Sequence, residues 1–172
     1  MSSGRLYVCP MTKVVDTVRG SGARSLVTVL TAGASLVRPC EIARERHLRI
    51  AVSDIDKPVD GHVLPGEEHI DRLLAFTEKW DRTDPMVIHC YAGVSRSPAA
   101  AYVVACALAP HRCEFELAQE LRRVSPTATP NRRLIALADR RLGREGRMVA
   151  AIAAIGRGTD CFEGAPFALE LA

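Results

Sequence analysis

Residues 86–98 read Met86-Val-Ile-His-Cys-Tyr-Ala-Gly-Val-Ser-Arg-Ser-Pro98, and they join a strand, a loop and a helix start. The first residues form a short apolar run that is typical of a central, buried strand. Pro98 favours the first turn of a helix, where its missing N–H costs nothing. Gly93 lies between these elements and lets the backbone amides turn inward with no Cβ in the way. The sequence therefore predicts a strand–loop–helix unit whose loop ends at a helix N-terminus.

This loop has the chemistry of an anion site. Free N–H groups and the positive end of a helix dipole favour a doubly charged phosphate. The same amides would stabilise a thiolate at Cys90, which makes it a candidate nucleophile. The planar guanidinium of Arg96 can hold two phosphoryl oxygens at once, and the hydroxyl of Ser97 can hydrogen-bond the sulfur. We interpret the loop between them as a phosphate cradle, which consists of Tyr91, Ala92, Gly93, Val94 and Ser95.

The spacing of Cys90 and Arg96 is not specific by itself. Cys40 and Cys106 also have an arginine six positions later. The segment after Cys40 contains two glutamates, which would repel a bound anion. Cys106 lies in an alanine-rich apolar run that is typical of a buried helix, where a cysteine behaves as a small hydrophobic residue. The sequence context therefore selects Cys90.

Residues 89–97, His-Cys-Tyr-Ala-Gly-Val-Ser-Arg-Ser, resemble the signature of the cysteine-dependent protein tyrosine phosphatases, and in detail that of the dual-specificity subgroup. The resemblance includes residues 50–54, which are similar to the strand and acid-bearing loop of that family, and residues 125–131, which are similar to the turn before a late helix. It covers about residues 47–142, and the whole chain resembles small bacterial tyrosine phosphatase family proteins. The resemblance implies hydrolysis of phosphomonoesters through a cysteinyl-phosphate intermediate, with no metal or cofactor.

Such a reaction needs a general acid for the leaving oxygen and a general base for the attacking water. The candidates are Asp54, Asp56 and Asp60. We favour Asp54 because it follows the apolar run 48–52, and the active crevice of an open parallel sheet lies at the carboxyl ends of its strands. Asp56 remains an alternative and Asp60 a weaker one. For His89, the resemblance implies that it supports the loop through hydrogen bonds and transfers no proton.

The chain alternates between predicted strands and predicted helices. This order favours an α/β fold, with a central, mostly parallel sheet flanked by helices and a helical C-terminal half. The predicted strands are 6–9, 26–30, 48–53 and 86–89. The predicted helices are 11–19, 70–80, 97–109, 114–124, 130–142 and a last one that carries Met148, Ile152 and Ile155 and stops at Gly156.

Two predictions concern the later part of the chain. For the helix 130–142 we predict Thr129 as N-cap and Pro130 as first residue, whereas Asn131 fits a helix start as well as a contact to the loop. The tail 157–172 is predicted to dock on the domain through Phe162 and Phe167.

Composition is typical of one soluble domain. A chain of 172 residues with 48% hydrophobic and 25% charged residues favours a single domain over residues 1–172. The net charge of +3 favours phosphorylated substrates but is too small for a nucleic-acid binder. We find no signal-peptide core, no membrane span and no zinc-ligand spacing among the six cysteines. We therefore expect a cytoplasmic protein without a nucleic-acid or membrane partner.

The sequence leaves the substrate open. The resemblance favours protein phosphotyrosine, together with phosphoserine and phosphothreonine, but it also allows a small-molecule or lipid phosphate. A third interpretation, from another class of protein, is a non-catalytic module that binds a phosphorylated partner. The partner is in each case a phosphorylated protein or a small phosphoester, and the oligomeric state stays unknown.

Overall fold

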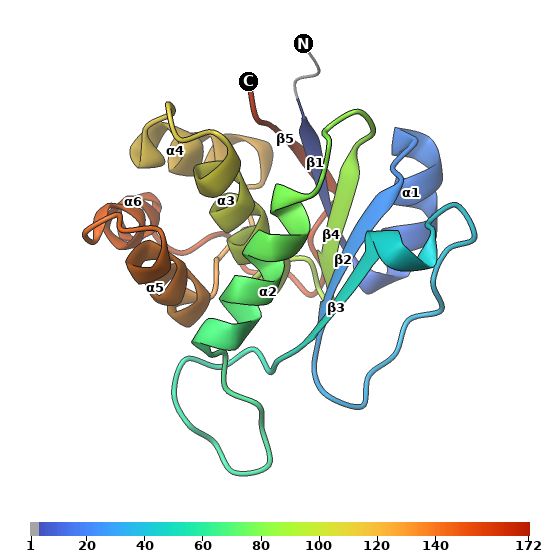
Figure 1. The fold of residues 1–172 in the computed structure, drawn as a ribbon. Coiled ribbons are helices and arrows are strands. Elements are labelled where there is room, and N and C mark those ends of the chain that lie inside the picture. Colours follow the sequence, from blue (N-terminus) through green and yellow to red (C-terminus); the bar gives the residue numbers. More distant parts are fainter. Residues whose placement is uncertain (1–3) are drawn as a thin grey trace.

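The computed structural model describes residues 4–172, so residues 1–3 of the predicted domain lie outside the described part. A five-stranded sheet forms the centre, in the order β3-β2-β4-β1-β5 (Figure 1). The first four strands are parallel to their neighbours, and the last is antiparallel to β1. The prediction of a mostly parallel sheet is confirmed. The strands are β1 (Arg5–Pro10), β2 (Ser25–Leu30), β3 (His47–Ala51), β4 (Met86–Cys90) and β5 (Phe167–Glu170).

Helices cover both faces of this sheet. Figure 1 shows α1 on one side and α2 to α6 on the other, and each side has its own apolar core. Within residues 4–172, no helix combines the length and the apolar content that crossing a membrane requires. The helices are α1 (Val14–Ser21), α2 (Glu67–Glu78), α3 (Arg96–Leu108), α4 (Glu114–Val124), α5 (Arg132–Arg141) and α6 (Arg147–Ile155), with short 3₁₀ turns at Met11–Lys13 and Arg44–Arg46.

The strand β4 and the helix α3 form the middle of the molecule. All five residues of β4 are buried, which explains its continuous apolar pattern, because a central parallel strand is covered on both faces. Residues 96–106 of α3 are also buried. Cys106 lies in this helix as predicted, and burial raises the pKa of its thiol to about 12, so it stays uncharged. The loop between β4 and α3 is therefore attached to two deeply buried elements.

Most predicted helix ends differ from the structure by one to three residues, and two of the differences have a clear cause. The helix α1 continues past Gly20 to Ser21, and its C-cap is Gly22, whose φ of +71° is the left-handed conformation that glycine adopts without strain. The predictions of Thr129 as N-cap and of Pro130 as first residue of α5 are wrong, because α5 begins at Arg132. Asn131 is the N-cap, since its side-chain oxygen accepts a hydrogen bond of 3.0 Å from the backbone N–H of Leu134.

The tail docks through one of its two phenylalanines. Phe167 is buried and begins β5, which pairs with β1 in a register that joins Val8 to Phe167. Phe162 is 91% exposed, so the prediction that it packs on the domain is wrong. The predicted helical C-terminal half is present as α3 to α6, and β5 adds a strand at the edge of the sheet that was not predicted.

Candidate active site

The loop 91–95 lies at the carboxyl edge of the sheet, between β4 and α3. Gly93 has a φ of +71°, and a Cβ at this position would come within 2.8 Å of the backbone nitrogen of Pro10. Any larger residue would therefore both strain the loop and push it away from β1. The predicted need for glycine at this turn is explained by this close approach.

Backbone contacts from three distant segments hold the loop from outside. In each contact a loop carbonyl accepts a hydrogen bond from another segment, so these carbonyls point away from the centre of the loop. The donors are the N–H groups of Met11 to Tyr91 (3.0 Å), of Thr129 to Val94 (2.8 Å) and of Gly164 to Ala92 (2.8 Å). A loop that is fixed in this way would lose little conformational entropy on binding an anion.

Cys90 lies at the floor of this loop and is 2% exposed. Its Sγ lies 3.0 Å from the Oγ of Ser97, and the backbone N–H of Gly93 donates to the same sulfur over 3.3 Å. One backbone donor and one hydroxyl therefore lie within hydrogen-bond distance of the sulfur. The structure brings Cys90 and Ser97 together as the sequence predicted.

Arg96 begins α3 beside the sulfur, and its side chain is 7% exposed. Its Nη1 donates to the hydroxyl of Thr31 (3.1 Å) and to the carbonyl of Val52 (2.9 Å). Its Nε is buried and has no hydrogen-bond partner. An unpaired buried donor of a charged group is costly, and a bound oxyanion would satisfy it. The guanidinium is thus held by hydrogen bonds from Nη1, while its Nε remains available to bind an anion.

The carboxylate of Asp54 is fixed at the rim of the loop. Its Oδ1 accepts hydrogen bonds from the hydroxyl of Ser95 (2.7 Å) and from the Nδ2 of Asn131 (2.9 Å). Asn131 therefore performs both roles that the sequence allowed, since it caps α5 and its backbone N–H donates to the carbonyl of Ser95 in the loop (3.2 Å). Neither Asp56 nor Asp60 hydrogen-bonds the loop 91–95. Asp54 is the best-placed of the three candidate acids.

A chain of hydrogen bonds supports the loop from behind. The Nδ1 of His89 lies 3.1 Å from the carbonyl of Cys90, and its Nε2 lies 2.8 Å from the hydroxyl of Thr28, which in turn lies 2.8 Å from the Nε2 of His47. Burial lowers the pKa of His89 to about 4 and that of His47 to about 4, so both rings are neutral at pH 7.

The neutral rings fix the direction of this chain. A carbonyl only accepts, so the Nδ1 of His89 carries the hydrogen and its Nε2 is the acceptor. Thr28 must therefore donate to His89 and accept from the Nε2–H of His47. These hydrogen bonds fix the orientation of the His89 ring, and that ring donates to the carbonyl of Cys90. This is how His89 could support the loop, as the sequence predicted.

Acidification is expected to destabilise the protein through these histidines. The folded His89 takes up a proton only near pH 4, whereas an unfolded histidine does so near pH 6.5. At pH values between these two pKa values, the protein takes up a proton when it unfolds. The free energy of unfolding therefore falls as the pH falls from about 6.5 to about 4. For His89 the loss between pH 7 and pH 5 is about 2 kcal/mol.

Urea unfolding at both pH values measures this difference. His89→Gln should remove about half of the difference, because His47, whose pKa is also about 4, contributes a similar part. The matched variant at the exposed His111, His111→Gln, should keep the full difference. The same pH dependence in His89→Gln as in the wild type would contradict this assignment.

Sequence reasoning missed two residues of the site, Thr28 and Thr31. Thr28 interrupts the otherwise apolar strand β2, and Thr31 directly follows that strand. A buried polar side chain needs a hydrogen-bond partner, so the threonine within an apolar run was the available signal.

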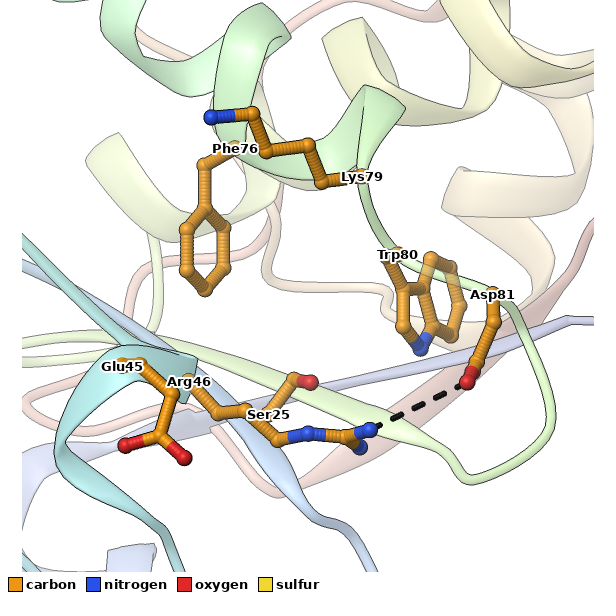
Figure 2. A pocket seen from close by; sticks show the side chains of 7 residues that line it. All are labelled: Ser25, Glu45, Arg46, Phe76, Lys79, Trp80 and Asp81. Carbon is orange, nitrogen blue, oxygen red and sulfur yellow. Dashed lines mark ion pairs between the residues drawn. The ribbon is translucent and has the colours of Figure 1, made fainter.

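The small pocket in Figure 2 lies elsewhere. It has a volume of about 100 Å³ and is lined by residues that include Ser25, Arg46 and Trp80. Ser25 pairs with Met86 at the amino end of β4, whereas Cys90 is at the carboxyl end of that strand. None of the predicted site residues lines this pocket. Within residues 4–172, no group of three or more His, Cys, Asp or Glu side chains is arranged as a metal site.

Solved structures share this fold at low sequence identity. Human tyrosine phosphatase-like serine/threonine/tyrosine-interacting protein has a TM-score of 0.63 at 13% identity, over 81% of this chain and 92% of that chain. A mouse putative dual specificity phosphatase complexed with zinc tungstate has a TM-score of 0.60 at 18% identity, over 87% and 86%. Human DUSP28 has 0.60 at 17%, over 78% and 86%. No family model and no curated protein sequence matches the chain.

Proposed function

We propose that this chain, which has the fold of the dual-specificity phosphatases, hydrolyses phosphomonoesters through a cysteinyl-phosphate intermediate. The observation that carries this proposal is the convergence at the loop 91–95. At this loop lie a sulfur that accepts a backbone N–H and contacts a hydroxyl, an arginine with an unpaired buried nitrogen, and a carboxylate held by Ser95. These are the nucleophile, the electrostatic stabiliser and the acid that phosphoryl transfer to a thiolate requires.

In the first step the thiolate of Cys90 attacks phosphorus. The S–P bond forms as the ester P–O bond breaks, and the carboxylic acid of Asp54 gives its proton to the leaving oxygen. Arg96 and the inward amides of the loop stabilise the charge on the equatorial oxygens.

In the second step Asp54, now a carboxylate, takes a proton from water. The water oxygen attacks phosphorus, the S–P bond breaks, and inorganic phosphate is released. The hydroxyl of Ser97 lies 3.0 Å from the departing sulfur and stabilises its returning negative charge.

The preferred substrate in this proposal is a phosphorylated protein, with phosphotyrosine before phosphoserine and phosphothreonine. The cradle residues Tyr91, Ala92, Val94 and Ser95 include no lysine to bind the further phosphates of an inositol phosphate. We further propose that the protein acts in the bacterial cytoplasm, where its free cysteines would stay reduced.

The release of p-nitrophenol from p-nitrophenyl phosphate, at pH 6 and in the presence of EDTA, tests this proposal. We expect turnover that EDTA does not reduce, because no step needs a metal ion. A folded wild-type protein that binds vanadate but releases no p-nitrophenol would instead favour the phosphate-binding module. The presence of Cys90, Arg96 and Asp54 together argues for the enzyme.

Asp54→Asn is expected to lower the turnover of phosphotyrosine by about 100-fold, because general acid catalysis contributes on the order of 10²–10⁴-fold. The asparagine oxygen can still accept from Ser95 and Asn131, so the loop geometry is kept while the proton is lost. p-Nitrophenolate leaves more easily than a tyrosine phenolate and should be less affected.

Comparison of the two substrates therefore reports on proton transfer rather than on folding. Asp56→Asn is the matched control and should retain its rate. If Asp56→Asn lowered the turnover of phosphotyrosine and Asp54→Asn did not, Asp56 would be the general acid.

A further inference from the structure

A groove leads away from the proposed active site. One hollow of about 380 Å³ is lined by Asp54, Ser95 and Asn131 among others, and a second of about 370 Å³ lies against α5 and α6. Both hollows are lined by Thr129, Pro130 and Arg132, so they adjoin at the turn before α5. We call the two together the α5–α6 groove.

The second hollow has an apolar lining. Ile135 comes from α5, and Val149, Ile152 and Ala153 come from α6. Val149 is 43% exposed. Aliphatic side chains that gather in a hollow beside a reaction centre are typical of a surface that binds a partner.

The charges at the ends of this hollow are positive. Arg132 lines both hollows, and its guanidinium makes no hydrogen bond or ion pair with any residue in 4–172. Arg157 lies at the other end and pairs with the exposed Asp160. No acidic residue lines the second hollow. A partner with acidic side chains therefore fits this surface better than a basic one.

The walls of the groove are held in place. Arg122 donates to the carbonyls of Ser125 (3.0 Å), Pro126 (2.9 Å) and Gly156 (2.8 Å), which ties the end of α4 to the end of α6. The hydroxyl of Thr129 accepts from the backbone N–H of Gly158 over 3.0 Å. A groove that is already formed loses little conformational entropy when it binds a peptide.

We infer that the α5–α6 groove binds the polypeptide that flanks the phosphorylated residue of a protein substrate. An aliphatic side chain of the substrate occupies the second hollow, and a neighbouring acidic side chain pairs with Arg132. This inference rests on the proposed phosphatase function and makes the substrate a phosphoprotein rather than a small ester. The apolar lining, the unpaired arginine and the continuity with Asp54 each support this occupant.

Two phosphotyrosine peptides of equal length test the inference. One carries alternating glutamate and leucine on both sides of the phosphotyrosine, and the other carries alanine. The wild type should favour the first by about 10-fold or more in kcat/KM, which corresponds to the roughly 1.4 kcal/mol of a tenfold change in binding. Val149→Asp places a charge in the second hollow, so it should remove most of this preference and leave turnover of p-nitrophenyl phosphate unchanged.

Arg132→Glu should lower kcat/KM for the acidic peptide more than for the alanine peptide. The matched control is Arg140→Glu, which makes the same change of charge at an exposed position near the other end of α5. It should retain the preference. Equal kcat/KM for the two peptides in the wild type, or an unchanged preference in Val149→Asp, would overturn the inference. A wild type that does not hydrolyse p-nitrophenyl phosphate would instead reject the proposed function itself.

Discussion

Cys90→Ser is expected to reduce the turnover of p-nitrophenyl phosphate by about 10⁴-fold or more, as the loss of a covalent nucleophile does in other enzymes. A serine hydroxyl is not ionised at neutral pH, and the two groups that contact this position are a backbone N–H and a hydroxyl, neither of which is a base at neutral pH. They could not deprotonate a hydroxyl. The loop itself should persist, because its outer contacts come from backbone groups that the substitution does not touch.

Three measurements make this result specific. Turnover should disappear, vanadate binding should remain measurable, and the melting temperature should change little. Cys40→Ser is the matched control, since Cys40 is exposed and has an arginine at the same spacing. It should keep full activity. Normal turnover in Cys90→Ser would reject the covalent mechanism.

Arg96→Lys is expected to have the second-largest effect, a loss of about 10³-fold in kcat, because removing a key electrostatic donor costs on the order of 10²–10³-fold or more. Lysine keeps the charge but lacks the fork that can anchor on Thr31 and Val52 while it binds two oxygens. The ammonium group cannot do both at once. The lysine ammonium beside the sulfur would then be mobile, whereas the arginine guanidinium is held in place.

The affinity for vanadate separates this effect from a loss of structure. In Arg96→Lys the affinity for vanadate should fall together with kcat. A cooperative urea unfolding transition should show that the variant is still folded. Arg46→Lys is the matched control, because Arg46 follows Cys40 in the sequence by the same number of residues as Arg96 follows Cys90. Full activity in Arg96→Lys would show that bidentate binding of the phosphoryl group is unnecessary.

Of the four strands that the sequence predicted, two are buried along their whole length. The residues of β2 and β4 are buried throughout, so their pattern can be recognised without knowledge of their neighbours. The strand β5 could not be predicted in this way. It has four residues, and its pairing with β1 depends on contacts across almost the whole chain.

The same distinction applies to the candidate site. Cys90, Arg96 and Ser97 lie in one short segment, so local pattern and spacing predicted their proximity, which the structure confirms for Cys90 and Ser97. The contact of Asp54 with Asn131 joins positions 77 residues apart. No local signal predicts such a contact, so the sequence favoured Asp54 over Asp56 only by its position at the end of a strand.

The hydrogen bond from Gly164 to the carbonyl of Ala92 has a consequence for biosynthesis. A ribosome adds residues from the N-terminus onward at roughly 5–20 per second. The loop after Cys90 therefore leaves the ribosome seconds before the segment that completes its outer support. If the proposed mechanism holds, a nascent chain carries Cys90 before its loop is fully supported, and activity should appear only once the segment that contains Gly164 has folded.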